Sequence, residues 1–297
     1  TAAAQFGGPR PAGPVRRAAP PADWPAPIAE QFFPDAFATL EGPRPDFTAK
    51  QTAPGATTTA PAATAPAGGI TWSALVSPET LADEIKQMKR LVDQSVAKQR
   101  GFISGGFKDA RNGFSSIAAA FGVIAVYDGD VRWKKDAPRA RDLFARVAFD
   151  CNQGNPATFT VAEKAAETLA SLLDGNAIEA GAAAGLPWNR IAARPPLMWR
   201  LDAVEKSLGE AIASQAAFDK GAERLVHDAE IAALIGEFIR QPDFEFHDDE
   251  TYAGYASTMR DAAVTAAAAA RKGDFDAASA AVSSLRKACT DCHGDYR

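Results

Sequence analysis

The residues best suited to chemistry lie at the end of the chain, where Cys289, Cys292 and His293 have the spacing Cys-x-x-Cys-His. This spacing is typical of a covalent haem attachment site, in which each thiol adds across one vinyl group of a haem. The histidine can then coordinate the iron. If residues 283–292 form a helix, Cys289 and His293 lie four residues apart on one face, so a sulfur and an imidazole can reach the same macrocycle.

Two other interpretations of the cysteine pair remain open, a structural zinc site and a redox dithiol. A zinc site needs a second pair of ligands, and the only other candidates are Cys151, His227 and His247. A redox dithiol is expected early in a chain, after a strand of a βαβ unit, whereas this pair follows an alanine-rich segment. We therefore favour haem. Cys151 is expected to be a buried small residue rather than a nucleophile.

Residues 285–297, Leu-Arg-Lys-Ala-Cys-x-x-Cys-His-x-x-Tyr-Arg, resemble the end of class II cytochromes c. This family comprises cytochrome c-prime and its methionine-ligated low-spin relatives, and about the last hundred residues share the resemblance. It implies one covalent haem c, carried on the last helix of a four-helix bundle, with His293 as the proximal iron ligand. It also implies that Arg286 and Arg297 contact the haem propionates, although positive charges near a helix end also complement the helix dipole.

The resemblance leaves the opposite face of the iron open. Cytochromes c-prime keep that position vacant and bind small gases, whereas their low-spin relatives fill it with a methionine from the first bundle helix. Met198 is the candidate ligand, because it precedes Phe218 by about the interval that the family leaves between its sixth ligand and the aromatic residue that opens the second helix. Met198 follows Pro196 by only two residues, and a buried methionine can simply fill a core. Met259 is expected to be such a core residue.

The composition of the chain excludes several classes of protein. A chain of 297 residues can form two domains, and 46% hydrophobic with 23% charged residues is typical of globular proteins. A net charge of −5 without a long basic run argues against general nucleic-acid binding. No apolar run reaches the roughly 18 residues of a membrane span. Covalent haem attachment occurs outside the cytoplasmic membrane, so the resemblance implies a periplasmic or otherwise extracytoplasmic protein. A secretory signal would then have been removed before Thr1.

Residues 1–70 differ from the remainder because they hold 13 of the 20 prolines, separated mainly by alanine, threonine and glycine. Proline lacks a backbone donor and favours extended backbone, so we expect an extended arm without a core of its own. We expect this arm to wrap around the helical part of the chain or to contact partner subunits.

Hydrophobic periodicity predicts four helices in residues 71–176. The first begins at Ser77 and Pro78, and glycines at 101, 105 and 106 end it. The third begins at Asp136. Thr160 and Glu163 form a predicted capping box for the fourth, which places Val161 on its inner face. After a linker, residues 177–194, the same plan recurs in residues 195–297, with helices expected to begin near Pro195, Phe218, Asp248 or Asp249, and Asp274.

We therefore predict an all-α protein with two tandem antiparallel four-helix bundles preceded by an extended Pro/Ala-rich N-terminal arm. The motif Met88-Lys-Arg-Leu91 recurs as Met198-Trp-Arg-Leu201, about 110 residues later, which suggests a duplication. The first copy has no cysteine or histidine where the haem motif should be, so we expect it to be haem-free. Four phenylalanines are expected to fill its interior: Phe107, Phe114, Phe121 and Phe144.

These features favour a monohaem c-type cytochrome in electron transfer, acting with redox partner proteins as a subunit of a larger extracytoplasmic or membrane-associated assembly. Two alternatives are a five-coordinate haem protein that binds small gases and a structural subunit with an incidental haem. The sequence contains no recognisable catalytic triad, carboxylate-pair motif or phosphate loop, so we expect an electron carrier rather than an enzyme.

Overall fold

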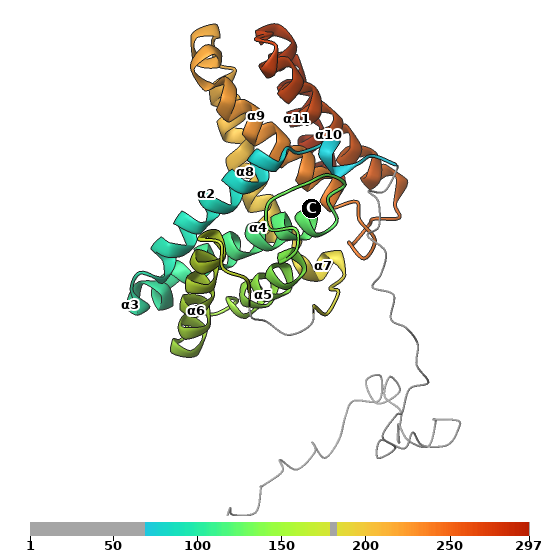
Figure 1. Ribbon diagram of the computed structural model, residues 1–297. Coiled ribbons are helices and arrows are strands. Elements are labelled where there is room, and N and C mark those ends of the chain that lie inside the picture. The colour runs from blue at the N-terminus through green and yellow to red at the C-terminus, as the bar shows by residue number, and fades with distance from the viewer. Residues whose placement is uncertain (1–68, 179–182, 297) are drawn as a thin grey trace, which may run out of the picture. The chain divides into compact units, whose positions relative to one another are not determined.

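The computed structural model describes residues 69–178 and 183–296 (Figure 1). All regular structure in these two ranges is helical, which confirms the predicted all-α class. The predicted N-terminal arm lies outside the described residues except for its last two positions. In the described ranges, no helix combines the length and the apolar character that a bilayer crossing requires.

The helices of the first half position its aromatic core. They are η1 (Trp72–Ala74), α2 (Pro78–Val96), α3 (Gln99–Gly101), the π-helical turn η2 (Phe102–Gly106), α4 (Phe107–Ala125), α5 (Ala137–Asp150) and α6 (Pro156–Leu173). The Ser77 hydroxyl accepts a hydrogen bond from the backbone N–H of Thr80, so α2 begins where the sequence predicts. The predicted end of this helix is wrong, because α2 ends at Val96, five residues before the first of the three glycines. Gly105 has a φ of 153°, a conformation that only glycine adopts readily, and it lies just before the start of α4.

The predicted start of the fourth helix is wrong. Helix α6 begins at Pro156, and the side chain of Asn155 accepts a hydrogen bond of 2.9 Å from the backbone N–H of Thr158. An asparagine cap followed by proline is a strong start signal, and it acts before the chain reaches Thr160. The Thr160 hydroxyl instead bonds to the carbonyl of Pro156 inside the helix. Val161 consequently points outward and is 42% exposed.

The helices of the second half follow the predicted order. They are α7 (Trp188–Ile191), α8 (Arg194–Ala211), α9 (Gln215–Phe238), α10 (Glu250–Arg271) and α11 (Phe275–Asp295). Asp249 and Asp274 cap α10 and α11, as predicted. Helix α9 begins three residues before the predicted Phe218, because Ser214 caps it. The short helix α7 lies in the segment that the sequence analysis treats as a linker.

The phenylalanines of the first half fill its interior, as predicted. Phe114, Phe121 and Phe144 are completely buried. The ring of Phe144 stacks on those of Phe114 and Phe121, with centroid distances of 5.9 and 5.8 Å. Of the four predicted phenylalanines, Phe107 lies at the edge of this core, where it is partly buried, and Phe149 of α5, which was not among them, is 64% exposed. Side chains therefore occupy the space between α4 and α5.

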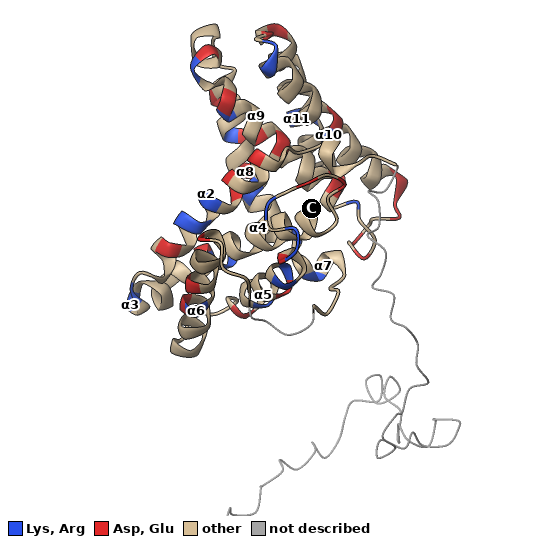
Figure 2. Ribbon diagram, in the orientation of Figure 1, with Lys and Arg blue, Asp and Glu red and all other residues tan. Residues whose placement is uncertain are grey.

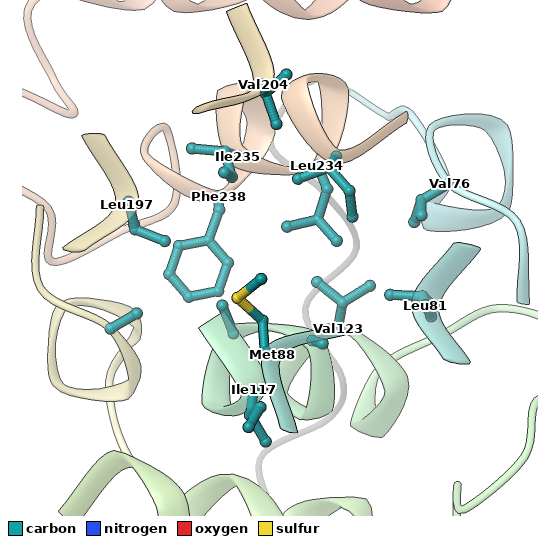
Figure 3. Close-up of a cluster of buried hydrophobic side chains, with 14 of the residues drawn as sticks. Val76, Leu81, Met88, Ile117, Val123, Leu197, Val204, Leu234, Ile235 and Phe238 are labelled. Atoms are coloured by element: carbon teal, nitrogen blue, oxygen red, sulfur yellow. The ribbon is translucent and has the colours of Figure 1, made fainter. Parts of the chain in front are cut away.

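The two halves share one hydrophobic core. Helices α2 and α4 of the first half pack against α8 and α9 of the second. Figure 3 shows Met88 and Ile117 in the same cluster as Leu197 and Phe238. The described helices thus belong to one compact unit. The predicted domain boundaries and the duplication remain predictions.

A buried group of charges also joins the halves. Charged residues are spread over the helices of both halves (Figure 2), and Arg200 of α8 is only 2% exposed. Its Nε and Nη2 donate to the two carboxylate oxygens of Glu84 on α2, at 2.7 and 2.8 Å. Asp228 of α9 accepts from His227 at 3.0 Å and from Arg224 at 2.5 Å. Burial alone would raise the pKa of Asp228, but hydrogen bonds from these neighbours lower it below its ordinary value.

Candidate haem-attachment site

Helix α11 carries the complete Cys-x-x-Cys-His motif. The side chain of Asp274 caps its first turn, and the helix continues through Asp295. Residues 283–292 are therefore helical, as expected, and Cys289 and His293 lie one turn apart on the same face. Both thiols are free and partly buried, whereas His293 is exposed. The helix thus presents two sulfurs and an imidazole in the order that the motif requires.

A pocket with an empty volume of about 750 Å³ lies beside the motif. Helix α8 contributes Met198, Leu201, Asp202 and Glu205, α10 contributes Tyr255, Ala256 and Met259, Ile239 follows α9, and α11 contributes Ala288 and the motif itself. Part of this space is open to solvent, so the cavity itself measures about 210 Å³, and most of its lining is apolar. Residues of the first half do not line the pocket.

Burial keeps the two thiols protonated in the protein without haem. It raises the pKa of Cys289 to about 11, and the carboxylate of Glu205 adds to the rise. Burial also raises the pKa of Cys292, and the positive charge of Arg194 opposes that rise. A reactive dithiol needs the opposite shift, because the thiolate is the nucleophile. Within residues 69–178 and 183–296, no cluster of three or more His, Cys, Asp and Glu side chains could hold a metal ion.

The other three candidate zinc ligands do not lie beside the cysteine motif. Cys151 is buried at the end of α5, and burial raises its pKa to about 12. The Nδ1 atom of His227 contacts Asp228, and that of His247 contacts the carbonyl of Phe244 at 2.8 Å. None of the three lines the pocket beside the motif. The geometry therefore favours the haem interpretation over a zinc site.

Two methionines line the pocket from different helices. Met198 lies in the first turn of α8, across the pocket from α11, and is partly buried. Met259 of α10 is 5% exposed, and its Sδ lies 3.7 Å from Sγ of Cys289. Met259 therefore packs beside Cys289, as a core residue would. Met198 is the methionine that faces the motif from the opposite wall.

Arg194 is a pocket neighbour that the sequence analysis missed. Its guanidinium lies over the rings of Phe246 and Tyr252, at 5.4 and 5.3 Å from their centroids, and its terminal nitrogens bond to Glu245. The Nε of Arg194 and the hydroxyl of Tyr252 are buried, and neither makes a hydrogen bond of ordinary geometry. Its charge also acts on Cys292. Arg194 and Tyr252 also interact with each other. A positive charge near the motif fits an anionic group such as a haem propionate.

The structure does not test the propionate contacts that the resemblance assigned to two other arginines. Arg286 forms an ion pair with Glu205, which joins α11 to α8 along the pocket. Its predicted propionate contact stays a prediction, and its partner in the structure is a carboxylate of the protein. Arg297 lies outside the described residues. Arg194 could have been found from its spacing, because it lies one turn before Met198 on the same helix face.

Comparison with known families identifies the segment that holds the motif. Residues 241–297 match the family model of Cytochrome C'. This segment contains α10, α11 and all of Cys289, Cys292 and His293. No curated protein and no solved structure gives a significant match to the chain. The match supports the resemblance to class II cytochromes c, and with it a haem-binding c-type cytochrome whose haem c is covalently bound.

The residues in the structure fit such a cofactor. Two thiols and one imidazole of α11 line a mostly apolar pocket, and the positive charge of Arg194 acts on Cys292. Residues Cys289 and Cys292 would hold the porphyrin through thioether bonds, and His293 would coordinate the iron. When bound, the haem supplies an iron centre that can accept and release one electron.

Proposed function

We propose that this protein is a monohaem c-type cytochrome that transfers electrons. The observation that carries the proposal is the complete Cys-x-x-Cys-His motif on one wall of a mostly apolar pocket. The match of residues 241–297 to the Cytochrome C' family adds support. In this proposal Cys289 and Cys292 attach the haem, and His293 is the proximal ligand.

We assign the sixth iron ligand to Met198. It lines the pocket from α8, whereas the motif lies on α11, so the two side chains approach the site from facing helices. Histidine with methionine is the ligand pair that raises the potential of a cytochrome and suits it to electron transfer. Both ligands lie on helices that are packed into the core, which keeps them in place when the charge of the site changes.

The other residues around the pocket exclude water from it and place one positive charge near it. The apolar side chains of Leu201, Ile239 and Met259 line the site and lower its dielectric constant. Arg194 is positioned by Phe246, Tyr252 and Glu245 to offer its positive charge to a carboxylate. This arrangement gives one polar edge to an otherwise apolar site, as expected of a haem pocket.

The first helical half supports a role within a larger assembly. It contributes no residue to the pocket, yet it is anchored to the second half through the Arg200–Glu84 pair and the shared core. A rigidly attached half without a site of its own provides surface for docking. We therefore propose a subunit of an extracytoplasmic electron-transfer assembly, since covalent haem attachment in this family takes place outside the cytoplasmic membrane.

Gas binding is the second candidate, and one observation favours it. Leu201 lies three residues after Met198 and lines the same pocket, so an apolar side chain is available to cover a vacant iron. A cytochrome with such a site would have a high-spin spectrum and would bind carbon monoxide rapidly.

The spectrum of the reduced protein separates the two candidates. Electron transfer with Met198 as ligand predicts the sharp, split visible bands of low-spin haem, and Met198→Ala should convert them to a broad high-spin spectrum. Met259→Leu is the matched control, because Met259 lines the same pocket beside Cys289, and its spectrum should stay low-spin. A low-spin spectrum that survives Met198→Ala would exclude Met198 as the ligand.

A further inference from the structure

Helices α8 and α11 face each other across the pocket but have little direct contact. Each packs closely on its sequence neighbour, α8 on α9 and α11 on α10, whereas the contact between α8 and α11 themselves is sparse. The ion pair between Glu205 and Arg286 is the charged contact that spans this gap. Both side chains are partly exposed, 36% for Glu205 and 45% for Arg286. The separation of these two helices therefore depends on few interactions.

Helix α8 has a specific place for the Arg286 guanidinium. Gly209 lies one turn after Glu205, on the same helix face. A Cβ atom at Gly209 would lie 2.2 Å from Nη2 and 2.9 Å from Cζ of Arg286. The guanidinium thus lies against α8 at Gly209, and a side chain at this position would force the guanidinium to shift. The carboxylate of Glu205 and the backbone at Gly209 together form the contact site of the Arg286 guanidinium, which we call the seat.

The position of this seat relates it to the two proposed iron ligands. Glu205 follows Met198 by seven residues on α8, and Arg286 precedes His293 by seven residues on α11. Seven residues are close to two helical turns, or about 10.5 Å, so each pair lies on one face of its helix. The ends of α8 and α11 that carry the ligands meet at the pocket, so the seat lies about two turns from the ligands on both helices.

We propose that Glu205, Gly209 and Arg286 form a latch that fixes α8 against α11 and so holds Met198 in place as a ligand. These are positioning residues, and the proposal rests on the proposed function with Met198 as the sixth ligand. A small molecule can bind the iron only after Met198 moves away with α8, and the latch opposes that movement. An exposed ion pair is weak, so disrupting the latch should raise the rate at which a small molecule binds the iron by about two- to fivefold.

The test is the rate at which carbon monoxide binds to the reduced, haem-loaded protein. Gly209→Ala inserts a Cβ into the seat and should speed binding by about two- to fivefold, as should Glu205→Gln. Gly221→Ala is the matched control, because it makes the same change in a helix where the new Cβ meets only Ala211 at 3.7 Å. Both glycine variants gain the same helix propensity. The double variant Glu205→Gln with Gly209→Ala should be no faster than either single variant, since both disrupt one contact.

The results distinguish failure of the latch from failure of the proposed ligand. If the parent protein binds carbon monoxide as fast as Met198→Ala does, Met198 is not the ligand, and the latch proposal falls with it. If the parent is slow and Met198→Ala is fast, but Gly209→Ala matches Gly221→Ala, the latch alone is overturned. The high-spin fraction of the oxidised spectrum is a second readout, and it should rise in Gly209→Ala and stay constant in Gly221→Ala.

Discussion

Arg194 shows how a single side chain can be prepared for a cofactor. Its guanidinium lies over two aromatic rings and bonds to Glu245, and its positive charge opposes the rise in the pKa of Cys292 that burial causes. The cysteine motif could be found from its sequence spacing alone. The environment of Arg194 could not, because Phe246 and Tyr252 come from a distant segment that folding brings to the start of α8.

Replacing Arg194 by glutamine should lower the reduction potential. A positive charge near the haem disfavours the oxidised, more positive form, so its removal makes reduction harder by on the order of tens of millivolts. Redox titration of the purified protein measures the shift. Arg132→Gln is the control, because Arg132 also covers an aromatic ring, that of Trp133, but lies in the first half. An unchanged potential in Arg194→Gln would place this arginine outside the haem environment.

At the scale of elements, the sequence predicts most helix starts correctly, since local capping groups define them. Ser77, Asp249 and Asp274 all cap the helices that they were expected to cap. The error at α6 arose because two signals compete within a few residues, and the earlier one has both a cap and a proline. The turn of π-helix before α4 was predicted only as a break, because glycines alone do not specify how a chain turns.

The structure predicts different effects for the two competing residues at α6. Asn155→Ala removes the side-chain acceptor for the Thr158 amide and should reduce the free energy of unfolding by about 1 kcal/mol. Thr160→Ala should have little effect or should stabilise slightly, because residue 160 lies inside the helix, where alanine is favoured. Urea denaturation followed by circular dichroism measures both. A larger loss for Thr160→Ala would restore the original prediction.

At the scale of the molecule, the two halves are joined more closely than two sequential bundles need to be. The bonds of Arg200 to Glu84 link residues 116 positions apart, and the central core contains side chains from both halves. Periodicity within each half predicts the helices and their inner faces. It does not predict which outer faces pack together, because an amphipathic pattern contains no information about the partner helix.

Glu84→Gln should destabilise the whole chain because it removes one charge of a buried pair. Glu84 and Arg200 are 3% and 2% exposed, and breaking a buried pair by changing one member typically costs about 3 kcal/mol or more. Asp83→Asn is the matched control, since the neighbouring Asp83 forms only an exposed pair with Lys86 and should contribute about 1 kcal/mol or less. Thermal unfolding compares the two. Equal melting temperatures would show that the buried pair does not hold the halves together.

The most direct test of the account is the intact mass of the denatured protein. Full-length protein produced with the machinery for haem attachment should have the mass of the chain plus one haem. The Cys151→Ser variant should also carry the added mass of one haem, because Cys151 is buried away from the pocket. The double variant Cys289→Ser with Cys292→Ser should have the mass of the bare chain. A parent protein that releases its pigment on denaturation, or that never acquires one, would contradict the assignment.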